Sequence, residues 1–147
     1  MTPQELAAKT GEVIGTSDWF HVTQERINMF ADATGDHQFI HIDEEKAKMT
    51  PFGGTIAHGF LTLSLASAMS YDAVVPLEGV SMGVNYGANK VRFPSPVPVG
   101  SKVRLGVKVL EVEEIANGVQ MTMEFTFECE GSSKPSCVAE IIFRSYV

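Results

Sequence analysis

The sequence predicts an α+β domain in which a curved antiparallel sheet wraps round one long central helix. The stretch Ile56–Tyr71, IAHGFLTLSLASAMSY, is apolar on nearly every side and is interrupted mainly by small hydroxyl residues. A helix of that composition is buried by the elements around it. Segments Ser101–Glu113 and Val119–Glu130 alternate apolar and polar residues, which is typical of strands. The length of 147 residues favours one domain, spanning residues 1–147.

The first part of the chain predicts short elements in front of that helix. Residues Trp19–Val22 alternate weakly and indicate a short strand. Thr23 is a suitable N-cap for an amphipathic helix over Gln24–Ala33, and Gly35 is a plausible stop just past its end. The acidic run Asp43–Lys48 predicts one or two exposed helical turns, followed by a loop rich in glycine and proline.

The second half of the chain predicts the sheet. Asn117-Gly118 is a strong signal for a hairpin turn between the two alternating segments. In the second segment the apolar side chains Met121, Met123, Phe125 and Phe127 share one parity, opposite to that of the polar residues between them. Further strands are expected at Ser81–Gly87, Asn89–Phe93 and Cys137–Ser145. A sheet wrapped in this way round a helix is called a hot-dog fold, and its open edge is a natural seam for a dimer.

Composition limits the classes of function. A net charge of -7 argues against a nucleic-acid binder, which usually carries a basic patch. Cys129 and Cys137 are expected to be free thiols, although a disulfide across a hairpin is an alternative. The N-terminus lacks the pattern of a signal peptide, and the longest apolar stretch is too short to span a bilayer. We therefore expect a cytoplasmic protein with no membrane association.

One polar loop, GDHQFIH, stands out between the predicted helices. Asp36 and His41 are five residues apart, and such a pair can hold a water molecule and move its proton. From spacing alone, a surface turn with an exposed histidine is the stronger interpretation. A metal site would draw on Asp36, His37, His41, Asp43 and His58, but their spacing matches no metal-binding pattern, so no metal is expected.

Several other residues are candidates with a structural alternative. Gly59 lies near the start of the central helix, where free backbone N–H groups could bind a carbonyl oxygen; tight packing is the alternative. His58 can contact substrate or hydrogen-bond the neighbouring loop. Ser67 can reach a pocket or bond within its helix. Lys90 and Arg92 share one strand face, which is either solvated or in contact with phosphate.

Three blocks of sequence together carry a resemblance to a known family. They are FADATGDHQFIHIDEEKA, TIAHGFLTLSL and NKVRFPSPVPVGSKV, and in this order they resemble the MaoC-like, (R)-specific enoyl-CoA hydratases, over roughly residues 15 to 145. The resemblance implies that Asp36 and His41 are the catalytic pair and that Gly59 gives a backbone N–H to the thioester carbonyl. It also implies that Ser67 assists the pair, and it makes Lys90 and Arg92 candidates for contacts with CoA.

The chain departs from the family signature inside the polar loop. The family has Asn-Pro where this chain has Gln38 and Phe39, so the fixed φ of proline is lost and an aromatic ring is gained. This form resembles a branch that is similar to nodulation protein N. We expect Gln38, Phe39 and His58 to contact substrate, together with Lys90 and Arg92.

The resemblance implies a concrete reaction. A trans-2-enoyl-CoA binds with its carbonyl oxygen on the N–H of Gly59, and Asp36 accepts a proton from water as the water adds to C3. His41 holds that water and donates a proton to C2, giving an (R)-3-hydroxyacyl-CoA; the reverse reaction is a dehydration. No metal or redox cofactor is expected, since CoA is part of the substrate. The expected partner is a second copy of the chain, and the alternatives are a hot-dog thioesterase and a non-catalytic acyl-CoA-binding protein.

Overall fold

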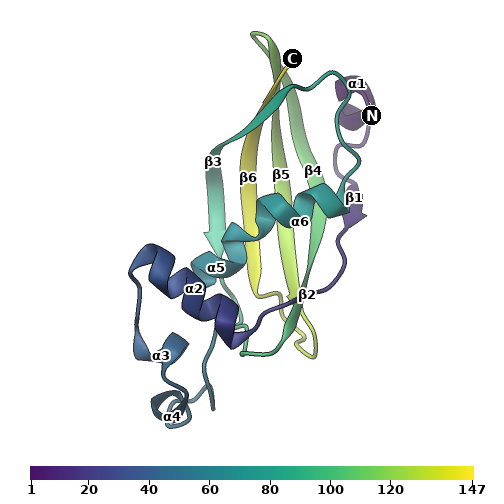
Figure 1. Cartoon of the computed structure of the whole chain (residues 1–147). Helices are drawn as coiled ribbons and strands as arrows, with labels where there is room; N and C mark the ends of the chain where they lie inside the picture. The colour runs from purple at the N-terminus through teal and green to yellow at the C-terminus, as the bar shows by residue number, and fades with distance from the viewer.

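The structure, a computed structural model, describes residues 1–147 and is built on one antiparallel sheet (Figure 1). The sheet has the order β1-β4-β5-β6-β3, and the short strand β2 pairs with β4. Strand β3 therefore forms one edge of the sheet. The strands are β1 (Val13–Thr16), β2 (Phe20–His21), β3 (Met82–Arg92), β4 (Lys102–Ile115), β5 (Gly118–Cys129) and β6 (Cys137–Tyr146).

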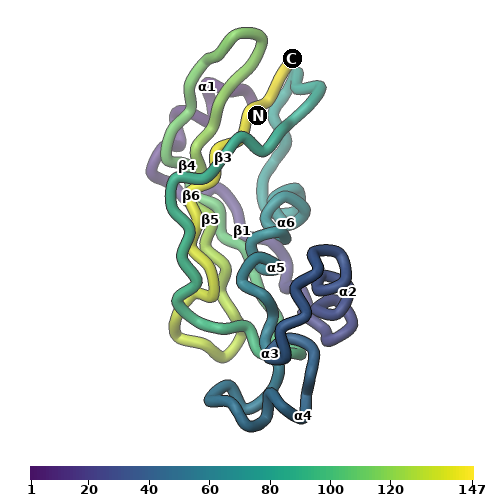
Figure 2. Tube along the Cα trace, turned by 90° about the vertical axis from the view of Figure 1, so that its left-hand side faces the viewer, coloured from purple at the N-terminus to yellow at the C-terminus, as the bar shows by residue number.

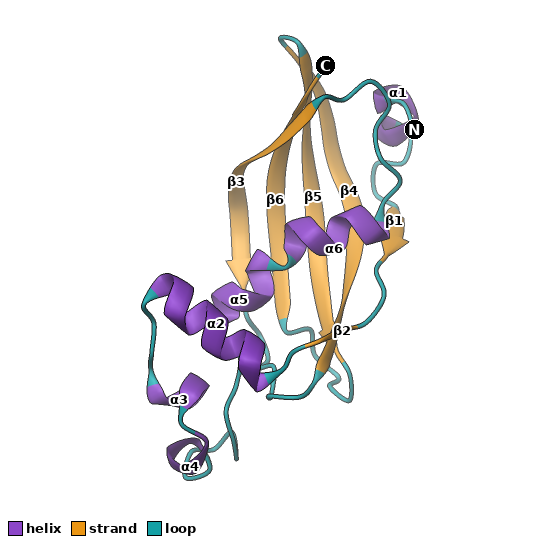
Figure 3. Ribbon diagram, viewed as in Figure 1, coloured by secondary structure: helices purple, strands orange, loops and turns teal.

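Helices cover one face of this sheet. Helices α5 and α6 lie across the middle of the face, and α2 lies beside α5 on the outer side (Figures 2 and 3). The helices are α1 (Pro3–Ala7), α2 (Gln24–Thr34), α3 (Phe39–Ile42), α4 (Glu44–Ala47), α5 (Gly59–Ser64) and α6 (Ala66–Ala73). None of them is both long enough and apolar enough to cross a membrane. The arrangement confirms the predicted α+β class.

The predicted β4–β5 hairpin is confirmed in detail. Asn117 has a positive φ of 60°, as its turn requires. A Cβ on Gly118 would lie 2.1 Å from the carbonyl oxygen of Ser145, so only glycine fits there. Strand β5 alternates as predicted, with Phe125 and Phe127 fully buried on the face toward the helices.

The prediction of one long central helix over Ile56–Tyr71 was wrong. Residues Thr55–Ala57 are extended instead, since the N–H of Ala57 bonds the carbonyl of Val97 at 2.9 Å and the N–H of Val99 bonds that of Thr55 at 3.0 Å. The helix therefore begins at Gly59 and divides at Leu65 into α5 and α6. It is also less enclosed than predicted, with Phe60 66% and Tyr71 81% exposed.

Other element boundaries differ from the prediction in smaller ways. The expected strands at Ser81–Gly87 and Asn89–Phe93 are one strand, β3, interrupted by two register shifts. The expected strand Trp19–Val22 is reduced to β2, and α2 extends one residue beyond the predicted Ala33. Helix α1, strand β1 and helix α3 were not predicted.

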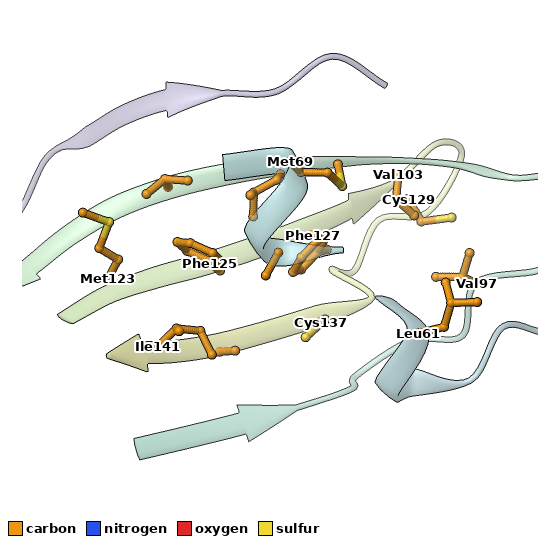
Figure 4. Packing of buried hydrophobic residues seen from close by; sticks show 14 of the residues in the cluster. Leu61, Met69, Val97, Val103, Met123, Phe125, Phe127, Cys129, Cys137 and Ile141 are labelled. Carbon is orange, nitrogen blue, oxygen red and sulfur yellow. The ribbon is translucent and has the colours of Figure 1, made fainter. Parts of the chain in front are cut away.

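The core lies between α5, α6 and the inner face of β4, β5 and β6. Met69 of α6 lies over the strands near Phe125 and Phe127, and Leu61 of α5 lies beside Val97 in the same cluster (Figure 4). Burying each such side chain contributes about 1.5–3 kcal/mol. Both cysteines are buried and free, as predicted: Cys137 pairs across the strands with Phe127 and not with Cys129. This core fixes the start of α5, where the candidate site lies.

Candidate functional site

The polar loop forms the corner between α2 and α3. Gly35 ends α2 with a left-handed φ of 80°, as predicted, and its N–H bonds the carbonyl of Ala31 at 2.8 Å. The carboxylate Oδ1 of Asp36 then accepts a hydrogen bond from the N–H of Gln38 at 3.2 Å. This turn directs the chain into α3 and leaves the Asp36 side chain exposed.

His41 is held from two sides inside the protein. It is 7% exposed, and its Nδ1 lies 2.8 Å from the carbonyl oxygen of Ile56. A carbonyl oxygen only accepts, so Nδ1 carries the proton and Nε2 is the atom that gains or loses one. The side chain of Gln24 donates to the carbonyl of His41 at 2.8 Å and accepts from the hydroxyl of Thr55 at 2.5 Å.

His58 joins the loop to the start of α5. It is 3% exposed, and its Nε2 donates to the backbone carbonyl of Asp36 at 3.0 Å. Its Nδ1 is buried with no hydrogen-bond partner. Burial lowers the pKa of His58, with a smaller lowering from nearby His41, against the opposing effect of the hydrogen bond to Asp36. His58 is therefore held as a neutral ring, and it stacks on His41 with the ring centroids 3.8 Å apart.

Asp36, His41 and His58 thus bring three polar side chains together. One carboxylate oxygen and one nitrogen from each ring lie within 4.8 Å of one another. These are metal-ligand types, but the two rings are stacked at an interplanar angle of only 22°. Ring nitrogens bind metal along lone pairs in the ring plane at about 2.0–2.1 Å, and one ion cannot lie in two stacked planes at that distance. The arrangement fits proton transfer better than metal binding.

Gly59 follows directly on this cluster. It is the first residue of α5, and its N–H has no acceptor within the chain. A Cβ at this position would lie 3.1 Å from the ring of Phe93, so any larger residue would push on that ring. The site thus has a carboxylate and an imidazole from the loop, and a free backbone N–H from the start of α5, which the hydrogen bond of His58 links to that loop.

The other predicted site residues lie outside this cluster. The hydroxyl of Ser67 donates to the side chain of Asn85 at 3.4 Å, and no hydrogen bond joins it to Asp36 or His41. Lys90 lies 3.8 Å from the carboxylate of Glu140, and Arg92 donates to the carbonyl of its neighbour Val91.

The two residues that depart from the family signature stay within the loop. Gln38 is the N-cap of α3, and Phe39 is 42% exposed. His37, which sequence reasoning set aside, bonds Asp32 at 2.9 Å instead of the cluster. That hydrogen bond raises the pKa of His37.

Sequence reasoning missed the residues that support the site. Gln24 and Thr55 connect α2, the carbonyl of His41 and the extended segment before α5, and Asn85 holds Ser67. Gln24 and Thr55 are 31 residues apart and belong to no local motif. Only the paired geometry of distant segments could have revealed them.

Comparison with known proteins gives one consistent family. The model of the MaoC like domain matches residues 5–128. The chain is 55% identical over 141 residues to 3-hydroxyacyl-thioester dehydratase Z of Mycobacterium tuberculosis, covering 95% of this chain and 93% of the relative. It is 45% identical over 140 residues to Nodulation protein N of Rhizobium leguminosarum bv. viciae, covering 94% of this chain and 87% of the relative.

The fold is also found among solved structures. One is the unliganded R-hydratase PhaJ1 from Pseudomonas aeruginosa, which aligns with a TM-score of 0.70 at 26% identity. The alignment covers 92% of this chain and 82% of that one. The single antiparallel sheet with helices on one face is the hot-dog fold of these proteins.

Proposed function

This chain belongs to the MaoC-like domain family, and we propose that it is a lyase that adds water to trans-2-enoyl-CoA, or removes it from the 3-hydroxyacyl product. The proposed product is the (R)-3-hydroxyacyl-CoA. The observation that carries the proposal is the meeting of Asp36 and His41 beside the free N–H of Gly59. These groups are the minimum for acid–base chemistry next to a thioester carbonyl.

In the proposed reaction, Asp36 is the base. Its exposed carboxylate takes a proton from a water molecule while the water oxygen forms a bond to C3 of the enoyl group. Electrons of the C2–C3 double bond move toward the thioester, and a proton from Nε2 of His41 adds to C2. His41 begins as an imidazolium, whose Nδ1–H keeps its bond to Ile56 in both charge states. The proton on Asp36 then returns to His41, which restores both groups.

The N–H of Gly59 is the proposed donor to the thioester oxygen. Negative charge develops on that oxygen as the water adds, and a backbone N–H with no other acceptor is free to stabilise it. Removing one such donor typically costs about 100- to 1000-fold in rate. The proposed reaction uses no redox cofactor, because adding water to the alkene involves no net oxidation or reduction, and none of its proposed steps draws on a metal.

The proposed substrate contacts surround this centre. Phe39 and Gln38 are exposed at the loop corner, where they can contact the thioester as it enters. For His58 the hydrogen bond to the carbonyl of Asp36 favours a positioning role, in addition to the predicted contact with substrate. Ser67 is proposed to touch the acyl chain, since it lines a pocket of about 480 Å³ between α6 and the sheet.

A second copy of this chain is proposed to cover the edge strand β3. Nearly every residue of β3 is exposed, including the apolar Met82 and Tyr86, and an open edge strand readily pairs with another chain. Lys90 and Arg92 lie on this strand and are proposed to contact the phosphates of CoA. Sedimentation equilibrium at micromolar concentration should give twice the chain mass of 16.0 kDa; a monomer would contradict the pairing.

One assay tests the proposed reaction. The protein is incubated with crotonyl-CoA and with longer enoyl-CoAs, and the loss of the conjugated enoyl absorbance is followed beside the release of free thiol. Loss of the alkene without thiol, together with the (R) product by chiral chromatography, is the expected result. Thiol release would indicate a thioesterase, and no reaction with any chain length would indicate a binding protein.

A further inference from the structure

Two polar side chains outside the cluster of Asp36, His41 and His58 are bonded to each other. They are Gln24 at the start of α2 and Thr55 in the extended segment before α5. The hydroxyl of Thr55 donates to Oε1 of Gln24 at 2.5 Å. Nε2 of Gln24 donates to the carbonyl of His41 at 2.8 Å and to the side chain of a helix neighbour at 2.9 Å. Both N–H bonds and the oxygen of the Gln24 amide are therefore used, which fixes the orientation of the amide.

These bonds belong to a closed network of Gln24, Thr55, Ile56 and His41. Nδ1 of His41 donates to the carbonyl of Ile56 at 2.8 Å, and Ile56 is covalently joined to Thr55. From Thr55 the network passes to Gln24 and on to the backbone carbonyl of His41. It then returns through the His41 side chain to Ile56. The imidazole of His41 and its own backbone are thus tied to the same two segments, and rotation of the side chain breaks a bond of the network.

The extended segment that carries Thr55 and Ile56 is itself held on both sides. Thr55 is 2% exposed, and its carbonyl accepts the N–H of Val99, in the loop between β3 and β4, at 3.0 Å. The N–H of Ile56 donates to the carbonyl of Ile40 in α3 at 3.0 Å. The network is therefore anchored on a part of the chain that the fold keeps in place.

Helix α3, which carries His41, depends on such anchoring. The helix has only four residues, and its N-cap Gln38 makes no side-chain capping bond. Its first residue is Phe39 and not a proline, so no side-chain ring fixes φ there. A helix this short is not stable by itself. The position of His41 therefore follows from the bonds that α3 makes to other segments.

We propose that Gln24 and Thr55 are positioning residues that hold the imidazole of His41 for proton transfer, an inference that rests on the proposed function. In that reaction Nε2 of His41 gives a proton to C2, so the ring must keep its angle as the proton leaves. The bond from Nδ1 to Ile56 sets this angle, and the network fixes Ile56 relative to the His41 backbone. Neither Gln24 nor Thr55 lines the pocket between α6 and the sheet. Their loss should therefore act on kcat and not on KM.

The first test breaks the network at two separate bonds. In Gln24→Glu the carboxylate can still accept the hydroxyl of Thr55, but it cannot donate to the carbonyl of His41. Thr55→Val keeps the shape of the side chain and removes the hydroxyl. We expect each to lower kcat by about 10- to 100-fold with KM within about threefold of wild type, since small misplacements cost that much. Thr55→Ser restores the hydroxyl and should stay within about threefold of wild-type kcat.

Gln120→Glu is the matched control for Gln24→Glu. Gln120 of β5 is half-buried like Gln24, accepts from Arg144 at 2.8 Å and donates to Glu113 at 3.1 Å. The control therefore makes the same chemical change in a similar pair of bonds away from His41. It should keep wild-type kcat, which would show that a lost amide donor does not lower turnover through general loss of stability.

The second test is spectroscopic and needs no turnover. The chain has four histidines, and with isotopically labelled histidine a two-dimensional NMR spectrum distinguishes the Nδ1–H from the Nε2–H form of each neutral ring. At about pH 8.5, where histidine rings are neutral, we expect Nδ1–H for His41 and Nε2–H for His58. His41→Gln and His58→Gln assign the signals. Thr55→Val and Gln24→Glu should give a mixture of forms at His41 and leave His58 unchanged, because the bond from His58 to the carbonyl of Asp36 lies outside the network.

The two tests separate the inference from the proposed function. If no enoyl-CoA is turned over, the proposed function fails, and a mixture of forms confined to His41 would still support the restraint on its ring. An unchanged kcat in an active enzyme would overturn the inference. A His41 that keeps its single form in both variants would overturn it as well, since any loss of rate would then not act through this ring. A change at both His41 and His58 would show general loosening of the site and would also overturn it.

Discussion

Replacing Asp36 by Asn separates the charge of this side chain from its structural contact. Oδ1 of Asp36 accepts the N–H of Gln38 at 3.2 Å, and the amide oxygen of Asn can accept the same bond. Asp36→Asn therefore keeps the turn between α2 and α3 and removes the base. A general base contributes about 100- to 10,000-fold, or about 2.7–5.4 kcal/mol in the activation free energy. We expect kcat/KM to fall within that range.

Asp36→Ala provides the comparison. It removes the base and also the acceptor for the N–H of Gln38, whose loss costs about 1 kcal/mol, or a further fivefold in rate. Asp36 is exposed, so neither variant should change the free energy of unfolding by more than about 1 kcal/mol. A larger fall for Ala than for Asn would show that the turn also orients the reacting groups.

The assay is the initial rate of loss of enoyl absorbance, with urea unfolding run on each variant. Asp32→Asn is the matched control, because Asp32 lies four residues earlier, bonds His37 and carries the same charge. It should retain wild-type kcat/KM. If Asp36→Asn stayed within tenfold of wild type, the assignment of the base would be wrong, and His41 would be the next candidate.

Three further predictions concern stability and reactivity. In the folded protein the pKa of His58 lies below its ordinary value of 6.5. Below that pH the unfolded chain therefore binds more protons than the folded one, and the free energy of unfolding falls. His58→Gln should reduce that fall in urea unfolding measured between about pH 5 and 8. Burial raises the pKa of the Cys137 thiol to about 11 and also raises that of Cys129; a thiol reagent at neutral pH should therefore label neither until denaturant is added, and rapid labelling of the native protein would contradict the burial. Leu61 is 2% exposed, so Leu61→Ala should lower the free energy of unfolding by about 2–5 kcal/mol in urea titrations. A loss below about 1 kcal/mol, as is usual for surface substitutions, would contradict its place in the core.

Local signals predicted the elements that depend on local physics. Thr23 caps α2, Gly35 ends it, and Asn117 with Gly118 forms the hairpin, because each needs only its own backbone conformation or a neighbour three or four residues away. The alternation in β5 likewise follows from one strand having one buried face. The start of α5 was missed because Thr55–Ala57 pairs with residues 40 or more positions later along the chain. Such bonds leave no pattern in the sequence of either segment.

The candidate site was likewise predictable from the sequence only in part. The pairing of Asp36 and His41 was implied by the family resemblance and not by their spacing alone, and the structure brings the two side chains together. The tautomer of His41 depends on the carbonyl of Ile56, fifteen residues away, and the stacking on His58 depends on where α5 begins. Both follow from the fold and could not be derived from spacing. The roles of these residues in catalysis stay predictions until the variants are measured.

The hydrogen bond from His58 to the carbonyl of Asp36 has a mechanical consequence. His58 is covalently joined to Gly59, so the residue that restrains the acid–base loop is also the residue next to the proposed carbonyl donor. The acid–base loop and the proposed carbonyl donor are therefore linked through His58. A displacement of the loop is transmitted to the N–H of Gly59 through a single peptide unit, and substrate bound at either half should stiffen the other. A substitution that breaks the hydrogen bond from His58 should therefore impair water activation and carbonyl binding in proportion, and not one without the other.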